Sequence, residues 1–549
     1  MKKILYVIAA SAAVLAAASC STIDKMTKMA EQVTVTCEPS VLEVVAGEID
    51  ATVSVTYPAG YFNPKAIVKV TPVIVYEGGE ASMKEFVYQG EKVKDNYKLV
   101  SSDGQTVTEK VHFDYVKGME KCYLELRSTV LFGKKDIPLP VKKVADGANT
   151  TYMLVKDKGV VSLLPDGYVD TYTVTKEGQI LYQVNSADVR SSELSSASIK
   201  ELQKVLEEAK ENDRAVVKGT EIVAYASPEG AEALNNKLSE NRSKSASKAW
   251  DKVAKGTDAT PPEVKSAGED WEGFQALVAE SDIQDKDLIL RVLSMYSDPA
   301  VRESEIRNLS EIFTELKAEV LPELRRARLI ATVEYSNPTS EELLKLLDED
   351  EDVLSEAALL RAATLVSSDA AKQAVYNKAI KKFDSDKARY NLAVLLLNEG
   401  DDKAAEKQLN ACKLSGPEIS NAKGVVALRH GDLETAANFF RAAANDDAEA
   451  NMGIVAILQG NYDEAVALLE DSKGCCHNPA LAYTLTDQLE KASAKIHCEC
   501  PKCIYLKAII AARQGRAADV KKFVEAAGED SPELKARALN DIEFAGYDL

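Results

Sequence analysis

Hydrophobic and polar residues repeat with different periods along the chain, and each period covers its own stretch. From Gln32 onward, short runs such as QVTVTC and ATVSVTY alternate apolar and polar side chains, a period typical of half-buried β-strands. Pro-Ala-Gly, Glu-Gly-Gly and Ser-Asp-Gly turns separate six or more of these runs. The pattern predicts an all-β sandwich over residues 32–165, with a connector at Pro138–Asp166 where the runs thin out.

Between residues 166 and 336 the period switches back and forth between strand and helix. Apolar runs alternate with segments whose apolar residues share one helical face, so we expect single strands separated by amphipathic helices. The predicted order is a strand from Gly178, a helix at Ser195–Asn212, a strand at Val216–Tyr225, a helix at Asn235–Ala254, a strand at Val264–Gly273, a helical insertion at 284–320 and a closing strand at 329–335. This stretch is therefore predicted to be an α+β domain.

After Asn337-Pro338 the chain consists of alanine-rich helical segments that repeat. Four columns recur: a small residue, a glycine or aspartate, a second residue that is mostly alanine, and a large apolar residue, with steps of 7, 5 and 4. Small residues let two antiparallel helices approach, and glycine permits the turn between them. The pattern predicts an all-α solenoid over residues 337–549, with turns at Gly400, Gly431, Gly460, Asp487 and Gly515.

These columns resemble those of the tetratricopeptide repeat, whose small, glycine, alanine and aromatic positions have the same steps. The turn residues recur every 27 to 31 positions, which is shorter than the family's period of about 34, and the first-helix tryptophan is absent. Leu359–Phe383 fits an opening repeat, and Ser531–Tyr547 fits a capping helix. The resemblance implies a surface that binds protein partners.

The N-terminus has the pattern of an export signal. Lys2 and Lys3 precede an apolar run at Ile4–Ala18, which is short for a membrane-spanning helix of about 20 residues. The run ends Ala17-Ala18-Ser19-Cys20 and resembles a bacterial lipobox, whose cysteine becomes the lipidated N-terminus. An ordinary cleaved signal peptide is the alternative. The prediction is a lipoprotein signal peptide at 1–19, a lipid on Cys20 and a tether at 20–31.

Composition narrows the classes of function. A net charge of −20 at pH 7 leaves no basic surface for phosphates, so we expect no nucleic-acid binding. The chain has four histidines and no nucleophile elbow, phosphate loop, HExxH or EF-hand motif. Acidic pairs such as Glu269-Asp270 are predicted to be solvated surface. We therefore predict that the protein is not an enzyme and has neither a cofactor nor a bound metal.

The most specific motif of the chain lies in the strand, turn and helix of Thr220–Trp250. Its spacing resembles the core motif of the OmpA-like peptidoglycan-binding domain, except that Ser227 stands where that family has an aspartate. The family's opening and closing elements follow in order around it. Matching positions are Ser186, Ala187, Val189 and Arg190 in the opening, Gly230, Asn235, Leu238, Ser239 and Arg242 in the core, and Leu324-Arg325-Arg326-Ala327 before the closing strand.

This resemblance implies a peptidoglycan site. In the family the acid and the arginine hold diaminopimelate, the arginine on a carboxylate and the acid on the ammonium. The implied site residues are Ser227, Glu229, Gly230, Asn235 and Arg242. Because Ser227 carries no charge, the predicted binding is weak, with Glu229 as the candidate replacement for the acid. The alternatives are a surface salt bridge for Arg242 and roles as helix-capping and turn residues for Asn235 and Ser239.

Besides Cys20 the chain has eight further cysteines, an even number that fits disulfides in an exported protein. Cys37 and Cys122 each lie on a predicted strand, and a disulfide between them is predicted. Disulfides between adjacent repeats are also favoured. A zinc site and a redox motif are the alternatives, because Cys500-Pro501-Lys502-Cys503 has the spacing of either. Two connectors on one edge of the predicted solenoid carry Cys475, Cys476, Cys498, Cys500 and Cys503.

The order of lipid anchor, β-sandwich, OmpA-like domain and helical repeats resembles a cell-envelope lipoprotein of Bacteroidota. We predict a non-catalytic scaffold anchored in the outer membrane, facing the periplasm because no run of acids follows Cys20. It binds peptidoglycan weakly through residues 166–336 and envelope proteins through the repeats. The alternatives are an accessory subunit of an outer-membrane assembly or secretion complex that has lost wall binding, and an envelope redox or metal protein that uses the C-terminal cysteines.

Overall fold

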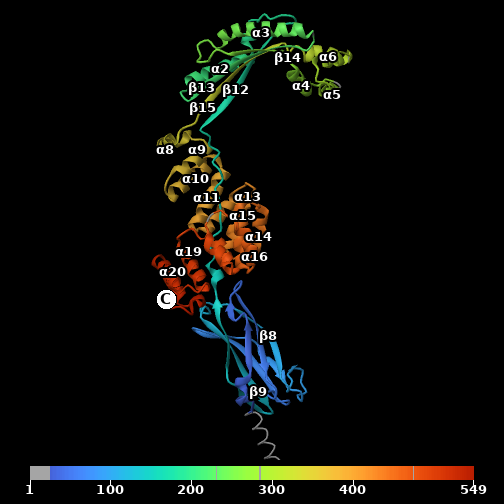
Figure 1. Cartoon of the computed structure of the whole chain (residues 1–549). Coiled ribbons are helices and arrows are strands. Elements are labelled where there is room, and N and C mark those ends of the chain that lie inside the picture. The colour runs from blue at the N-terminus through green and yellow to red at the C-terminus, as the bar shows by residue number, and fades with distance from the viewer. Residues whose placement is uncertain (1–24, 230, 284–285, 309, 474) are drawn as a thin grey trace, which may run out of the picture. The chain divides into compact units, whose positions relative to one another are not determined.

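The computed structural model of the chain describes residues 25–229, 231–283, 286–308, 310–473 and 475–549 (Figure 1). The predicted signal peptide, 1–19, and Cys20 lie outside the described residues. Two compact units form: residues up to Pro165 together with Tyr376–Leu549, and Asp166–Val375. Within the part of the chain that the structure describes, no helix combines the length and apolarity needed to cross a membrane.

Two β-sheets make up the N-terminal part of the first unit. The smaller sheet has the order β1-β3-β8, with β1 (Thr34–Glu38), β3 (Glu48–Tyr57) and β8 (Gln105–Asp114) antiparallel. Val55 of the smaller sheet and Val68 and Leu126 of the larger sheet line one small shared cavity, so the sheets enclose a common apolar core. The larger sheet has the order β2-β11-β9-β4-β6-β7, with β10 on β9 and β5 on β4: β2 (Val41–Glu43), β4 (Ile67–Tyr76), β5 (Gly79–Ser82), β6 (Phe86–Gln89), β7 (Lys98–Leu99), β9 (Cys122–Phe132), β10 (Lys135–Pro138) and β11 (Lys142–Asn149).

The predicted connector at Pro138–Asp166 is wrong in its first part. β11 lies inside the larger sheet, where it is antiparallel to β9 and parallel to β2. Its sequence, KKVADGAN, is interrupted by charges and a glycine, and its register shifts between Lys143 and Ala145, so a strict alternation is absent. The described end of the predicted tether is also packed, because Met26 and Ala30 are buried.

The second unit contains a four-stranded sheet with helices in the predicted order. β12 (Thr171–Leu181) and β13 (Ala215–Ala226) both run antiparallel to β15 (Arg326–Ser336), and β13 runs parallel to β14 (Glu263–Glu269), giving the order β12-β15-β13-β14. The main core of this unit includes Ile180, Leu202, Ile222, Trp250 and Leu329. The helices packed on the sheet are α2 (Ala197–Glu211) and α3 (Glu232–Val253).

The predicted insertion, 284–320, shares an apolar core with the helix that precedes it; this core includes Phe274, Ile289, Ile306 and Leu316. Three further helices close the second unit after β15, although α10 extends past its last residue, Val375. The strand predicted at Val264–Gly273 ends early, at Glu269, and α4 (Trp271–Glu280) begins within its predicted range. The insertion helices are α5 (Lys286–Met295), α6 (Pro299–Asn308) and α7 (Ser310–Glu319), and the closing helices are α8 (Ser340–Glu349), α9 (Glu356–Leu365) and α10 (Asp369–Phe383).

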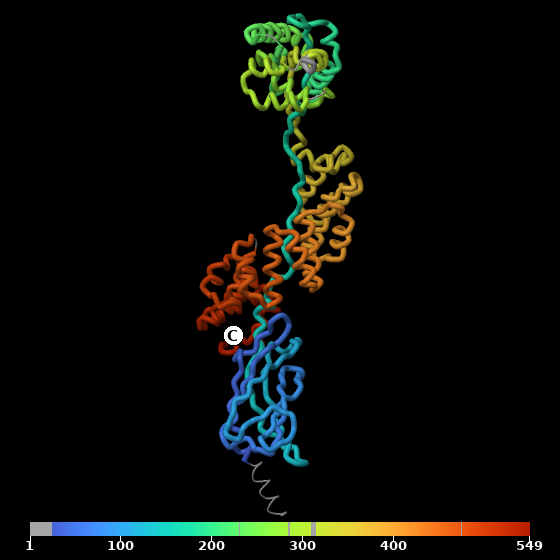
Figure 2. Tube along the Cα trace, turned by 90° about the vertical axis from the view of Figure 1, so that its right-hand side faces the viewer, coloured from blue at the N-terminus to red at the C-terminus, as the bar shows by residue number. Residues whose placement is uncertain are grey.

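The rest of the first unit is a solenoid of antiparallel helix pairs, as the repeating columns predict (Figure 2). Each predicted turn residue has a positive φ: Gly400, Gly431, Gly460, Asp487 and Gly515. A Cβ added at Gly424 would lie 2.5 Å from the ring of Phe440, so the small column permits the close approach of the paired helix. The helices are α11 (Asp386–Glu399), α12 (Asp402–Ala411), α13 (Pro417–Arg429), α14 (Leu433–Ala443), α15 (Asp446–Leu458), α16 (Tyr462–Leu469), α17 (His477–Leu485), α18 (Leu489–Lys495), α19 (Pro501–Arg513), α20 (Ala517–Asp530) and α21 (Pro532–Ala538).

Candidate functional site

The first half of α3 buries polar side chains instead of apolar ones. Asn235, Ser239 and Arg242 recur at helical spacing on the buried face, whereas Ala246 and Trp250, further along the same face, pack in the core. Buried polar groups are stable only with hydrogen-bond partners. The polar end of α3 therefore marks a site where side-chain chemistry, and not apolar packing, determines the structure.

Arg242 is fully buried and binds main chain from two strand ends. Its Nε donates to the carbonyl of Ser186 at 3.0 Å, and its two terminal nitrogens donate to the carbonyls of Tyr225 at 2.9 Å and Gln183 at 3.2 Å. Burial lowers the pKa of the Arg242 guanidinium to about 10. The predicted alternative of a surface salt bridge is wrong, because three of the five N–H groups of the guanidinium hold backbone carbonyls.

Glu229 places a carboxylate beside Ser227, the position for which the predicted motif has an aspartate. Its Oε1 accepts a hydrogen bond from Ser227 Oγ at 2.8 Å and from Arg325 Nε at 3.0 Å, and Arg325 belongs to the predicted arginine pair. The Glu229 side chain is 15% exposed. The turn after β13 thus aims this acid inward, where Ser227 and Arg325 hold it.

These residues line one open cavity of about 790 Å³ in the second unit. Gly230, the remaining predicted site residue, lies outside the described residues. The insertion contributes Arg307, whose guanidinium donates to the main-chain carbonyl of Glu229 at 2.9 Å, and Lys317, which is exposed. Among the described lining residues Glu229 is the one acid, and Arg242, Arg307, Lys317 and Arg325 are cations, of which Arg307 also pairs with Glu303. The lining residues are Val184, Asn185, Ser227, Glu229, Leu234, Asn235, Leu238, Arg242, Arg307, Thr314, Lys317, Ala318 and Arg325.

Asn235 is held on the wall of this cavity by an acid. Its Nδ2 donates to Glu269 Oε1 at 2.8 Å, and Trp271 Nε1 donates to the other oxygen of Glu269 at 2.9 Å. The neighbouring Asp270 is 3% exposed and pairs with Arg326 at 2.8 Å. The prediction that these two acids are solvated surface is wrong, and so is helix capping by Asn235.

A second recognition surface lies in the first unit, where the solenoid binds residues 154–164 of its own chain, here called the clamped segment (Figure 2). Asn478 accepts from the Lys156 N–H at 2.8 Å and donates to the Lys156 carbonyl at 2.9 Å. Asn451 forms the same pair of bonds with Val160, at 2.7 and 2.9 Å, and Asn391 with Leu164, at 2.8 and 3.1 Å. Every fourth residue of the segment is therefore bound through its backbone.

We call this surface the asparagine face; it comprises Asn391, Asn421, Asn451 and Asn478, from α11, α13, α15 and α17. Arg429 and Tyr390 add bonds to the carbonyls of Lys158 and Ser162, at 2.7 and 2.9 Å. Gly159 has a φ of +75°, and a Cβ there would lie 2.7 Å from Val425. The segment therefore lies directly against α13, without room for a side chain at Gly159.

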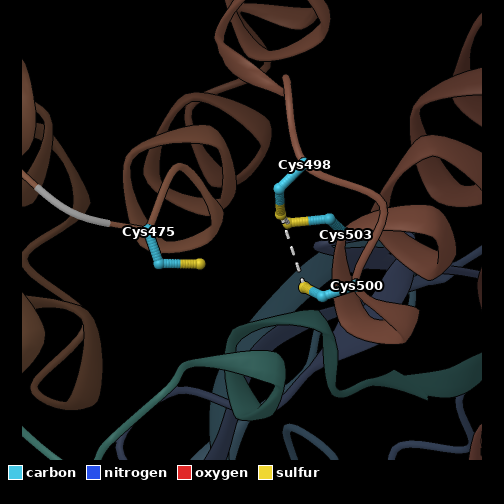
Figure 3. A group of neighbouring side chains, drawn as sticks. All are labelled: Cys475, Cys498, Cys500 and Cys503. Carbon is cyan, nitrogen blue, oxygen red and sulfur yellow. Dashed lines mark hydrogen bonds between the residues drawn. The ribbon is translucent and has the colours of Figure 1, made fainter.

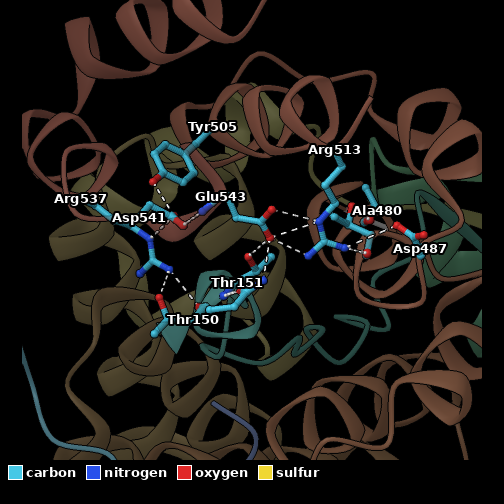
Figure 4. A network of polar contacts seen from close by, with 11 residues as sticks. Thr150, Thr151, Ala480, Asp487, Tyr505, Arg513, Arg537, Asp541 and Glu543 are labelled. Atoms are coloured by element: carbon cyan, nitrogen blue, oxygen red, sulfur yellow. Dashed lines mark hydrogen bonds and ion pairs between the residues drawn. The ribbon is translucent and has the colours of Figure 1, made fainter. Parts of the chain in front are cut away.

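A charged network fixes the start of this path (Figure 4). Glu543 accepts hydrogen bonds from Thr151 Oγ1 at 2.8 Å and from Asn149 Nδ2 at 2.9 Å, and it pairs with Arg513 at 2.6 Å. Arg537 donates to the Thr150 carbonyl at 2.9 Å. The end of β11 is thereby joined to the last helices of the solenoid.

The cysteines do not form the predicted disulfides: each of the eight in the described residues is a free thiol. Cys37 lies on β1 of the smaller sheet and Cys122 on β9 of the larger sheet, so the proposed pair is divided between the two sheets. In the solenoid, the two predicted connectors meet, and their five cysteines gather there, with Cys498 Sγ 3.1 Å from Cys503 Sγ; they are Cys475, Cys476, Cys498, Cys500 and Cys503.

Sequence reasoning identified Ser227, Glu229, Asn235 and Arg242 as site residues, and Leu238 and Arg325 as motif positions, but missed the cations of the insertion. Arg307 and Lys317 lie in α6 and α7, for which the sequence predicts only a helical insertion, so nothing in the local sequence places them beside Glu229. The asparagine face was also missed. Its signal is an asparagine near the middle of three successive first helices, at Asn391, Asn421 and Asn451.

No protein-family model and no curated protein matches the chain. Among solved structures, the chain is similar to the Cut9-Hcn1 hetero-tetramer of the APC/C, with 12% identity, a TM-score of 0.31, and coverage of 36% of this chain and 45% of that one. It is similar to a tetratricopeptide repeat protein from Parabacteroides merdae, with 16% identity, a TM-score of 0.30, and coverage of 37% and 91%. A third similar structure is YrrB, described as a TPR protein with an unusual peptide-binding site, with 17% identity, a TM-score of 0.21, and coverage of 37% and 99%.

Proposed function

We propose that this protein is a non-catalytic scaffold of the bacterial cell envelope that binds a wall peptide in the cavity of its second unit. The observation that carries the proposal is the convergence of Glu229 with Arg307, Arg325 and Lys317 on one open cavity of about 790 Å³. Diaminopimelate carries carboxylates and an ammonium, so a cavity with several cations and one acid complements both kinds of charge.

The OmpA-like motif supports this choice of ligand, but residues other than Ser227 and Arg242 would bind the ammonium and the carboxylate. Arg242 binds main-chain carbonyls, so the exposed cations Arg307 and Lys317 are the groups placed to bind a ligand carboxylate. Glu229 takes the part of the missing aspartate toward the ammonium. Because Arg325 already pairs with Glu229, the ammonium competes with an internal cation, which keeps the binding weak.

The test is a calorimetric titration of the full chain with a diaminopimelate-containing muropeptide. Charge-assisted hydrogen bonds contribute about 1.5–3 kcal/mol each, so the double variant Arg307→Gln, Lys317→Gln should bind at least about tenfold more weakly than wild type. Lys200→Gln, on the exposed side of α2, is the matched control and should leave the affinity unchanged. Absence of heat with the wild-type chain, or equal affinities for the double variant and the control, would refute wall-peptide binding at this cavity.

The remaining parts of the scaffold follow from the N-terminus and the repeats. The lipobox-like Ala17-Ala18-Ser19-Cys20 supports a lipid anchor on Cys20 in the outer membrane, with the protein facing the periplasm. Replacing Cys20 with Ala should move the protein from the membrane fraction to the soluble fraction of the envelope. The lipid anchor is contradicted if this variant stays in the membrane fraction and the wild-type protein carries no lipid. Protein partners would bind the solenoid outside the asparagine face, since that face holds the clamped segment.

A second candidate is an accessory subunit of an outer-membrane assembly or secretion complex that has lost wall binding. The three carbonyl bonds of Arg242 favour it, because they commit the family's ligand-binding arginine to the fold. Crosslinking in intact envelopes, followed by purification, separates the two candidates. Recovery of a stable set of outer-membrane proteins, with no muropeptide binding in the titration above, would favour the accessory subunit.

A further inference from the structure

Four cysteines from two neighbouring connectors of the solenoid meet at one point. The sulfurs of Cys475, Cys498, Cys500 and Cys503 all lie within 4.8 Å of one another. Cys475 precedes α17, Cys498 lies between α18 and α19, and Cys500 and Cys503 lie at the start of α19. Figure 3 shows the four side chains turned toward a common space.

We propose that Cys475, Cys498, Cys500 and Cys503 bind one zinc ion. In a tetrahedral site with Zn–S bonds of about 2.3 Å, neighbouring sulfurs lie roughly 3.8 Å apart. Cys498 Sγ lies 3.5 Å from Cys500 Sγ and 3.1 Å from Cys503 Sγ, closer to that spacing than to the bond of about 2.05 Å in a disulfide. Cys500 and Cys503 also have the two-residue separation common among zinc ligands.

The number of converging sulfurs distinguishes zinc from the disulfides that the sequence favours. A disulfide uses two sulfurs and sets no requirement on a third or fourth. Here one ligand from the connector before α17 joins three from the connector before α19. Four sulfur ligands around one point are the arrangement of structural zinc sites, in which the ion contributes directly to folding.

A cation from the clamped segment lies beside the cluster. Lys156 Nζ donates to Cys475 Sγ at 3.0 Å and to Cys500 Sγ at 3.2 Å. Zinc with four thiolates carries a net charge of −2, so an ammonium in this position offsets part of that charge and fixes the sulfurs by hydrogen bonds. The site thereby links two adjacent repeats to the segment that the asparagine face holds.

The experiment measures the metal content and metal affinity of the full chain, purified with reductant and then titrated with zinc. We expect one zinc per chain, and cobalt in its place should give the visible absorption of a tetrahedral thiolate site. Cys475→Ser is the informative variant, because Cys475 is exposed and its loss leaves the core intact. We expect Lys156→Gln, which removes a hydrogen-bond donor to two of the sulfurs, to weaken zinc binding about 10- to 100-fold. Cys475→Ser removes a ligand and should weaken zinc binding at least as much.

Cys476→Ser is the matched control. Cys476 is adjacent to Cys475 and its sulfur lies 3.9 Å from that of Cys503, but it is not among the four sulfurs that share mutual contact. This variant should keep one zinc per chain. The proposal is overturned if the reduced wild-type chain takes up no zinc, if peptide mapping of protein from its native compartment finds a Cys498–Cys503 disulfide, or if Cys476→Ser loses zinc while Cys475→Ser keeps it.

Discussion

The asparagine face of the solenoid and the cavity of the second unit are both lined by polar side chains, but only the first holds a segment of the chain itself. The asparagine face uses neutral amides that pair with the backbone of every fourth residue of the clamped segment. The cavity uses charged groups, with Arg307, Arg325 and Lys317 around Glu229, and is open. The neutral amides bind the backbone of the clamped segment, where the contact with Val425 restricts the side chain at Gly159, whereas charges select an ionic ligand.

We therefore expect the two polar surfaces to have different roles, one in stabilising the fold and one in binding an external ligand. A surface that holds its own chain through paired backbone bonds stabilises the fold, and an external peptide must displace the clamped segment before it can bind there. In the open cavity the internal partners are single side chains: Arg325 pairs with Glu229, and Arg307 pairs with Glu303. External ligand recognition is therefore expected in the second unit.

The largest loss of stability is expected for Arg242→Ala. If Arg242 is a structural residue, its loss destabilises the second unit, whereas a residue that only binds ligand could be removed without that loss. Arg242→Ala leaves three carbonyls without their donor, and each buried group left unpaired costs about 1–3 kcal/mol, so the free energy of unfolding should fall by more than about 3 kcal/mol. Both tryptophans, Trp250 and Trp271, belong to this unit, so fluorescence during denaturation reports its unfolding.

Arg307→Gln is the control for that experiment, because it removes the same charge from an exposed position of the cavity. Its free energy of unfolding should stay within about 0.5 kcal/mol of wild type. If Arg242→Ala unfolds at the same denaturant concentration as wild type, Arg242 is not the structural residue described here.

A smaller effect is expected on the asparagine face. Asn451 is fully buried and forms two bonds to Val160, so Asn451→Ala should lower the free energy of unfolding of the solenoid by about 1–3 kcal/mol. Denaturation followed by the helical circular-dichroism signal measures this loss. Asn410→Ala, an exposed asparagine of α12, should change little; equal losses for the two variants would show that the clamped segment does not depend on the face.

The smallest effect is expected at the pair between Glu342 and Arg214, which joins the start of α8 to the residue before β13. Hydrogen bonds from Arg214 lower the pKa of Glu342 to about 2. The stabilisation is therefore complete above the unfolded pKa of about 4.3 and is lost as the pH falls toward the folded value. Glu342→Gln should flatten the dependence of thermal stability on pH between about 4.5 and 2, whereas Glu341→Gln should leave the slope as in wild type.

Short-range patterns in the sequence predicted the elements well where one local requirement dominates. The turn column was confirmed because a left-handed turn favours glycine, and Asp487 shows that an aspartate can take its place. β11 was missed because a strand within a sheet can carry charges and a glycine when its neighbours supply the hydrogen bonds. The cavity cations and the clamped segment depend on contacts between residues far apart in the chain, such as Asn391 with Leu164, which no local period encodes.

The most direct test of the central claim, that the solenoid binds its own chain, is amide hydrogen exchange of residues 154–164 in the full-length protein. The N–H groups of Lys156, Val160 and Leu164 donate to Asn478, Asn451 and Asn391, so these amides should exchange far more slowly than those of an unstructured linker of the same sequence. Exchange of all three at the linker's rate would contradict the account, because it would mean that the asparagine face is free in solution.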